Sequence, residues 1–133
     1  MKKLNKVFVY GTLKEGKRNH HVIPAGAILK KSRAYINNAD LYEFVGGDFP
    51  CLIPGTGKVF GEIFEIREEL LKETMEALDF LEGYRPNNPY NLYNREVKSL
   101  HVDSGQLEAY VYVYNTEGPM STRLGDKIEN GTF

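Results

Sequence analysis

The sequence of 133 residues has no tryptophan, a single cysteine and no long hydrophobic run. One cysteine excludes a disulfide within the chain, which suits a reducing compartment. Cys51 has no obvious base beside it, so we expect a small buried side chain rather than a nucleophile. The apolar stretch between Lys6 and Lys14 is far shorter than the roughly 20 residues that a membrane-spanning helix needs, and no signal-peptide core precedes it. We therefore expect a cytoplasmic protein without a membrane partner.

Charge and motifs also argue against a nucleic-acid or cofactor site. The formal net charge is −1, and no basic cluster with interleaved aromatic residues occurs, so nothing attracts a nucleic acid electrostatically. The sequence contains no phosphate-binding or dinucleotide-binding glycine loop and no spaced set of metal ligands. His20 and His21 are adjacent, which points their side chains apart. We expect no cofactor and no metal.

The length and composition indicate one globular domain. A chain of 133 residues is about one domain long and can bury a sizeable core. Its 41% hydrophobic and 26% charged content is ordinary for such a protein. No internal repeat, low-complexity segment or domain boundary is visible, so we predict a single domain over residues 1–133. The oligomeric state does not follow from the sequence.

An apolar segment near the N-terminus, Val7 to Tyr10, predicts a strand buried on both faces. Gly11 and Thr12 then end the run. A glycine there permits a positive φ or the close approach of a ligand. Free amides in such a turn hold a carboxylate or phosphate well. The alternative is an ordinary turn after a strand.

Further along the chain, the pattern predicts one long helix and several strands. The helix spans residues 67–81, because its apolar residues fall on one stripe, and Gly83 ends it. The expected strands are residues 27–36 in two halves, 39–44, 59–66, 92–102 and 107–114, with turns at 37–38, 55–57 and 103–105. Five or more strands with one principal helix indicate an α+β fold.

Glu82 is the strongest candidate for chemistry. It lies four residues after Leu78 and seven after Met75, so its side chain falls on the apolar stripe of the helix. Partial burial and the negative end of the helix dipole both raise the pKa of a carboxyl there. A glutamate of that kind serves as a general base near neutral pH. The alternative is a solvated side chain at the helix end.

The sequence leaves the roles of four other polar side chains undecided. Glu62 shares a predicted strand face with apolar residues, so it is a second inward carboxylate, while Asp79 at the stripe edge would cap or pair with a neighbouring loop. Arg95 either balances an inward carboxylate of the protein, binds the carboxylate of a substrate, or forms an ion pair on the sheet. Tyr112 belongs to a tyrosine stripe that either packs in the core or lines a pocket.

The order of several motifs resembles the gamma-glutamylcyclotransferase-like superfamily, in the Tyr-Gly-Thr-Leu branch that includes gamma-glutamylamine cyclotransferases. The resemblance runs from about Lys6 to about Tyr114. It rests on the following residues: Val-Tyr-Gly-Thr-Leu-Lys at 9–14, then Gly16, Asn19 and His20, Phe49-Pro50, Val-Phe-Gly-Glu-Ile-Phe at 59–64, Leu-Asp-Phe-Leu-Glu-Gly-Tyr at 78–84 and Tyr93-Asn94-Arg95.

This resemblance implies a small mixed barrel-like sheet with the helix packed against it. It also implies a cofactor-free enzyme that releases 5-oxoproline from a γ-glutamyl amine or γ-glutamyl amino acid, with Glu82 as general acid and base. The loop of Tyr10, Gly11, Thr12 and Leu13 would bind the glutamyl head. Two alternatives are removal of a γ-glutamyl protecting group during biosynthesis and a binding domain without turnover.

Overall fold

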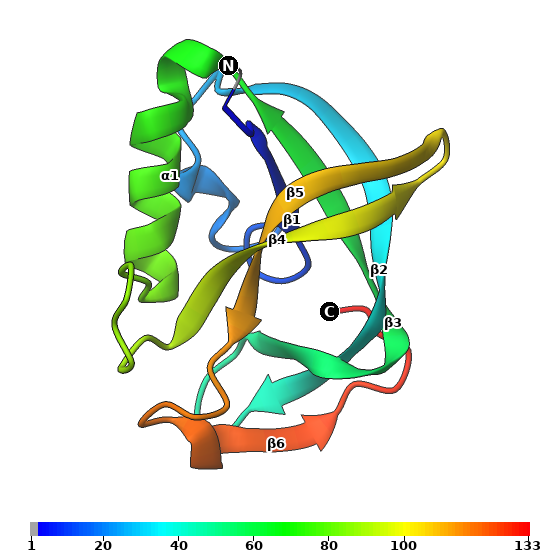
Figure 1. Cartoon of the computed structure of the whole chain (residues 1–133), viewed down its shortest axis with the longest axis vertical. Helices are drawn as coiled ribbons and strands as arrows, with labels where there is room; N and C mark the ends of the chain where they lie inside the picture. Colours follow the sequence, from blue (N-terminus) through cyan, green and yellow to red (C-terminus); the bar gives the residue numbers. More distant parts are fainter. Residues whose placement is uncertain (1–2) are drawn as a thin grey trace.

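The computed structural model describes residues 3–133. Among these residues, no helix is long and apolar enough to cross a membrane. One main helix and six strands follow one another, with two short 3₁₀ turns, as β1 (Lys6–Val9), η1 (His20–Val22), β2 (Ile28–Phe44), β3 (Pro50–Ile66), α1 (Glu68–Glu82), β4 (Tyr93–Val102), β5 (Gly105–Tyr114), η2 (Ser121–Arg123) and β6 (Leu124–Lys127) (Figure 1). The predicted α+β class is confirmed.

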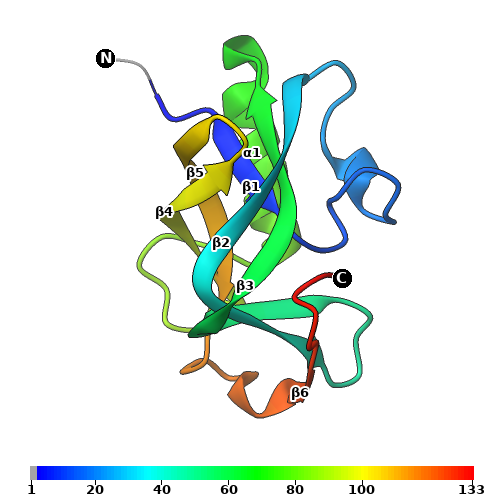
Figure 2. The same cartoon turned by 90° about the vertical axis from the view of Figure 1, so that its right-hand side faces the viewer.

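The strands form one mixed sheet that closes on itself. Its order is β3-β1-β5-β4-β2-β6, and an additional pairing of β3 with β2 joins the first five strands into a ring. Among the strands of residues 3–133, β1 and β5 pair in parallel and all other pairs are antiparallel. Figure 2 shows β2 and β3 running side by side as a long twisted ribbon. This closed arrangement confirms the predicted barrel-like sheet.

Strand β1 lies at the centre of both hydrophobic clusters. Val7 and Val9 pack with residues of α1, whereas Phe8 and Tyr10 pack in the second cluster, among β2 to β5. All four side chains are at most 6% exposed. The prediction of a strand buried on both faces is therefore confirmed. The loop that follows Tyr10 begins between these two buried clusters.

Helix α1 packs along one side of the sheet (Figure 1, green) through the predicted apolar stripe. Its buried residues are Leu71, Thr74, Met75 and Leu78. Gly83 ends the helix at φ 66°, in the left-handed region, and the Tyr84 N–H donates to the Asp79 carbonyl at 2.9 Å. This cap fixes the direction of the last turn, from which Glu82 projects.

Two expected turns are wrong, because both lie inside continuous strands. The strand ladder runs from Asn37 opposite Lys58 to Ala39 opposite Pro54, so both strands become irregular at the same place and bend together. Asn38 takes the left-handed conformation there, with φ 57°. The Gly55–Gly57 segment wraps the Asp40 carboxylate so closely that a Cβ at residue 55 would lie 2.0 Å from Asp40 Oδ2. The local turn signals were real, but they produce a kink rather than a chain reversal.

Strand β6 was not predicted. It pairs with the end of β2, where Tyr42 lies opposite Lys127 and Phe44 opposite Leu124. Its sequence, Leu-Gly-Asp-Lys, has no strand-like alternation of buried residues, and only the neighbouring strand end supplies its hydrogen bonds. The hairpin of β4 and β5 was predicted, and it starts its return strand two residues earlier than expected.

Candidate active site

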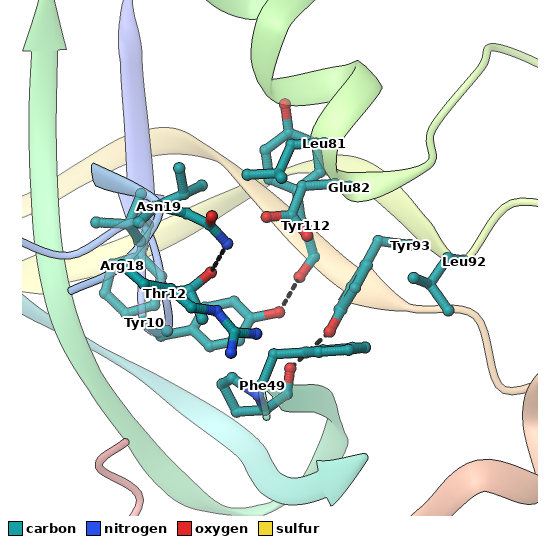
Figure 3. Close-up of a pocket in the computed structure, with 15 residues that line it drawn as sticks. Tyr10, Thr12, Arg18, Asn19, Phe49, Leu81, Glu82, Leu92, Tyr93 and Tyr112 are labelled. Atoms are coloured by element: carbon teal, nitrogen blue, oxygen red, sulfur yellow. Dashed lines mark hydrogen bonds between the residues drawn. The ribbon is translucent and has the colours of Figure 1, made fainter. Parts of the chain in front are cut away.

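A pocket of about 240 Å³ opens where β1 ends, between the following loop and the end of α1 (Figure 3). Glu82 enters it from the helix, Thr12 and Asn19 lie on one side, and Tyr93 and Leu92 lie on the other. Its lining contains all five residues that the sequence singled out for the site, Tyr10, Gly11, Thr12, Leu13 and Glu82, together with Phe8, Val9, Arg18, Asn19, Phe49, Pro50, Leu81, Leu92, Tyr93 and Tyr112.

The loop after β1 is held by its own hydrogen bonds and leaves several amides free. Asn19 donates twice to Thr12, from its backbone N–H to the carbonyl and from Nδ2 to Oγ1, both at 2.9 Å. The Lys14 N–H donates to the Gly11 carbonyl at 3.1 Å. Within residues 3–133, the amides of Gly11, Thr12 and Leu13 have no acceptor. Three unpaired amides in one turn form an arrangement suited to an anion.

The reason for glycine at position 11 differs from the expectation. Gly11 does not have a positive φ, and the space beside its Cα is filled by protein. A Cβ at this position would lie 2.8 Å from both Cγ and Cδ of Pro50, which is too close for any side chain. Gly11 therefore lets the loop pack on the start of β3 and does not by itself open space for a ligand.

Glu82 carries a free carboxyl at the pocket wall. Its residue is half-buried, and within residues 3–133 no side chain or amide donates a hydrogen bond to it. Burial raises the pKa of Glu82 to about 7 from an ordinary value of 4.5. A carboxyl with that pKa exchanges a proton readily near neutral pH.

The tyrosines around Glu82 are donors rather than bases. Burial is the main cause that raises the pKa of Tyr10, and the nearby Glu82 charge raises it further. Tyr10 donates its hydroxyl proton to the Tyr112 carbonyl at 2.5 Å, and Tyr93 donates to the Pro50 carbonyl at 2.6 Å. Because these hydroxyls are occupied, they fix the pocket wall rather than supply a base.

Asp79 is held in a pair behind the pocket. Arg95 Nη1 lies 2.7 Å from Asp79 Oδ2, and the Tyr112 hydroxyl donates to Asp79 Oδ1 at 2.8 Å. Arg95 thus balances a carboxylate of α1, rather than pairing within the sheet, and it is not among the residues that line the pocket. Tyr112 does line the pocket, with its hydroxyl turned to Asp79.

Glu62 lies away from the site. It faces a separate surface cavity together with Lys14 and Arg33, and its Oε1 accepts the Glu15 N–H at 3.0 Å. The alternation of β3 correctly placed Glu62 and Phe64 on one face, but neighbouring residues of that face are covered by different parts of the molecule. Glu62 is not a competing carboxylate in the pocket.

Cys51, His20 and His21 have structural roles. Cys51 is fully buried, and burial raises its pKa to about 12, which disfavours the nucleophilic thiolate. His20 Nδ1 lies 3.0 Å from the Leu13 carbonyl oxygen, and His21 Nδ1 lies 2.9 Å from that of Arg18. In the described part of the chain, no three His, Cys, Asp or Glu side chains gather as metal ligands.

Several lining residues were not identified as such from the sequence. Asn19, Phe49 and Tyr93 belong to the quoted motifs, but nothing in their spacing indicated that they meet at one pocket. Arg18 and Leu92 carried no sequence signal. Arg18 and Asn19 reach the pocket because the loop after β1 folds back through the Asn19–Thr12 hydrogen bonds. Phe49, Leu92 and Tyr93 reach it because the closed sheet brings the start of β3 and the start of β4 next to that loop.

A family model described as gamma-glutamyl cyclotransferase, AIG2-like, matches residues 7–133, almost the whole chain. The chain belongs to this enzyme family. The resemblance that the motifs indicated is confirmed, and the position of Glu82 and the Tyr-Gly-Thr-Leu loop at one pocket gives the family's motifs a common place in the fold.

The chain aligns with most of the length of individual relatives. A gamma-L-glutamyl-butirosin B gamma-glutamyl cyclotransferase of Niallia circulans is 32% identical over 121 residues, covering 90% of this chain and 73% of the relative. A gamma-glutamylaminecyclotransferase of Bos taurus is 34% identical over 124 residues, covering 88% and 70%. The crystal structure of an AIG2-like protein from Mus musculus has a TM-score of 0.71 at 26% identity, covering 99% and 89% of the two chains.

Proposed function

We propose that the protein is a cofactor-free cyclotransferase that releases 5-oxoproline from a γ-glutamyl amine or γ-glutamyl amino acid. The observation that carries this proposal is Glu82, a half-buried pocket carboxyl with no hydrogen-bond donor within residues 3–133 and a pKa raised by burial to about 7. Its position opposite a loop with free amides matches what a substrate with one ammonium and one carboxylate requires.

In this mechanism the loop binds the substrate's glutamyl head. The amides of Gly11, Thr12 and Leu13 donate to the α-carboxylate, and the ionised Glu82 accepts a proton from the α-ammonium. The freed amine attacks the γ-carbonyl carbon, so a carbon–nitrogen bond forms and closes a five-membered ring. The bond to the leaving nitrogen then breaks as Glu82 returns its proton to that nitrogen, and the second proton lost by the ring nitrogen passes to the released amine, which departs as an ammonium.

The chemistry asks little of the protein beyond position and proton transfer. The amine and the carbonyl belong to one molecule, so the protein has only to hold the substrate in its ring-closing conformation, and a positioned base contributes about 10²–10⁴-fold. Neither step requires a covalent enzyme intermediate, a metal or a nucleotide. We propose the cytoplasm as the site of this reaction, in keeping with the single cysteine.

A second candidate within the same chemistry is removal of a γ-glutamyl group from a larger biosynthetic product. It is favoured by the relative at 32% identity that acts on gamma-L-glutamyl-butirosin B. The loop would bind the glutamyl head and Glu82 would transfer the proton in the same way. The two reactions would differ only in the leaving group, which lies outside the pocket.

The deciding experiment measures 5-oxoproline formed from a panel of γ-glutamyl amino acids and γ-glutamyl amines. An enzyme forms many equivalents of 5-oxoproline per protein molecule, in step with the free leaving amine. A domain that only binds its ligand would never form more than one equivalent, and that result across the panel would refute the proposed function.

A further inference from the structure

Arg18 is the one cationic side chain among the residues described as lining the pocket. Its neighbour Asn19 is fixed by two hydrogen bonds to Thr12, so the backbone that carries Arg18 is tied to the loop of the site. The Arg18 side chain is 51% exposed, which places it at the mouth. In Figure 3 its guanidinium extends from the Thr12 side toward Phe49.

The contact that Arg18 makes is loose. Its Nη1 lies 3.4 Å from Asp48 Oδ2, and the Asp48 side chain is 88% exposed. An exposed pair at that distance contributes little. A guanidinium has five N–H donors arranged for a carboxylate, so most of its binding capacity is available to a ligand at the mouth.

The two charged residues of the lining, Glu82 and Arg18, would contact different parts of a substrate. The glutamyl head occupies the loop amides and Glu82, so the leaving group extends from the scissile bond toward the opening. There it meets the Arg18 cation and the apolar walls formed by Phe49, Leu92 and Tyr93. A carboxylate on the leaving group is attracted by this cation, whereas a second ammonium is repelled.

We propose that Arg18 determines specificity, selecting γ-glutamyl amino acids over γ-glutamyl amines by binding the carboxylate of the leaving amino acid. This inference rests on the proposed function, because it concerns the leaving group of that reaction. It narrows the substrate class to compounds whose leaving amine carries an anionic group close to the scissile bond.

The test compares two substrates that differ only in the carboxylate, γ-glutamyl-L-alanine and γ-glutamyl-ethylamide. The parent protein should have a higher kcat/KM for the alanine compound by about tenfold, mostly through KM. Arg18→Gln should abolish that preference, and Arg18→Glu should reverse it. Arg85→Gln, which removes an exposed arginine outside the pocket lining, should leave the ratio of the two kcat/KM values as in the parent.

A further variant tests the loose pair. Asp48→Asn removes the carboxylate that competes for Arg18, so the preference for the alanine compound should grow about threefold. Circular dichroism and thermal unfolding of each variant establish that it is folded.

Three outcomes would overturn the inference. Equal kcat/KM values for the two substrates in the parent would show that the mouth does not recognise the carboxylate. An equal loss for both substrates in folded Arg18→Gln would assign Arg18 to the glutamyl head. Absence of 5-oxoproline from both substrates and from the rest of the γ-glutamyl panel with the parent protein would instead refute the proposed function, and the inference with it.

Discussion

Burial of the Glu82 carboxyl is unfavourable for the fold and useful for the proposed reaction. The difference between its ordinary pKa of 4.5 and about 7 corresponds to about 3 kcal/mol of disfavoured ionisation in the folded protein. No described donor or cation offsets this cost at the carboxyl itself, since Arg95 is bound to Asp79. A side chain that only filled space would be more stable as an amide.

Substitution Glu82→Gln is therefore expected to separate activity from stability. The amide keeps the size of the side chain but cannot accept the ammonium proton, so kcat should fall by about 10²–10⁴-fold, or about 3–5 kcal/mol of barrier. The free energy of unfolding at pH 8 should rise or stay the same. Steady-state formation of 5-oxoproline and urea unfolding measure the two effects.

Glu62→Gln is the matched control for that prediction. Glu62 lies outside the pocket and accepts only the Glu15 N–H, so this variant should keep most of the parent activity. Parent-like turnover by folded Glu82→Gln, or an equal loss in both variants, would contradict the assignment of Glu82 as the base.

The same pKa predicts opposite pH trends for activity and stability. Between about pH 4.5 and about pH 7 the folded state retains a proton on Glu82 that the unfolded state has lost, so stability falls as pH rises through this window. Activity rises over the upper part of it, because the base must be ionised. The rate of 5-oxoproline formation should thus have an acid limb near pH 7.

Urea unfolding at pH 5 and pH 8 checks the stability half of this prediction. The advantage of Glu82→Gln over the parent protein should be about 2–3 kcal/mol larger at pH 8 than at pH 5, because other titrating groups cancel between the two proteins. A pH-independent difference between them would show that Glu82 ionises with an ordinary pKa.

At the scale of elements, the end of α1 is joined to the β4–β5 hairpin by one polar cluster. Asp79 accepts from both Arg95 and the Tyr112 hydroxyl, and the Arg95 guanidinium lies 5.2 Å from the Tyr84 ring and 4.8 Å from the Tyr110 ring. Asp79 stands one helical turn before Glu82. The cluster therefore positions Glu82 relative to β5, whose Tyr112 lines the pocket.

Removal of the cation from this cluster should weaken both the fold and the positioning of Glu82. Arg95→Met leaves the half-buried Asp79 without its charge partner, which should lower the free energy of unfolding by about 1–3 kcal/mol and lower kcat more than it raises KM. The double variant Asp79→Asn/Arg95→Met should recover part of the loss, because no unpaired charge remains. Strictly additive effects in this cycle would show that the two residues do not interact.

The elements that could be predicted from the sequence were those whose signal is local. The stripe of α1 and the uninterrupted apolar run of β1 follow from side-chain spacing, and Glu82 could be placed on the helix for the same reason. The turns expected at 37–38 and 55–57 were wrong, since a glycine-rich or asparagine-rich segment bends a strand as readily as it reverses one. Whether such a segment bends or reverses the chain depends on how the strands pair, and strand pairing joins residues that are far apart in the sequence.

The site could likewise be predicted only where its residues carry a local sequence signal. The loop and Glu82 each carry a local signature, and both lie at the pocket. Arg18 and Leu92 carry none: one stands in a polar loop and the other between a loop and a strand. Arg18 becomes a site residue because the loop after β1 folds back on itself through the Asn19–Thr12 hydrogen bonds, and Leu92 because ring closure of the sheet brings the start of β4 to the end of β1.

At the scale of the whole molecule, the fold brings a turn with unpaired amides, the Glu82 carboxyl and an apolar wall together from four separate parts of the chain. The turn follows β1, Glu82 ends α1, and the wall comes from the starts of β3 and β4 (Figure 3). These parts supply every interaction that the proposed ring closure needs: anion binding, proton acceptance and proton return. The reaction is intramolecular in the substrate, so the molecule has no second reactant to activate.

Turnover should consequently be insensitive to metal removal. Extensive dialysis against a chelator is expected to leave both the rate of 5-oxoproline formation and the melting temperature as they were, because Glu82 and the loop amides act without a Lewis acid. The sequence also offers no spaced ligand set, and His20 and His21 contact backbone carbonyl oxygens. A loss of activity that one particular divalent ion restores would contradict this mechanism, and His20→Ala and His21→Ala would then identify whether the adjacent histidines hold that ion.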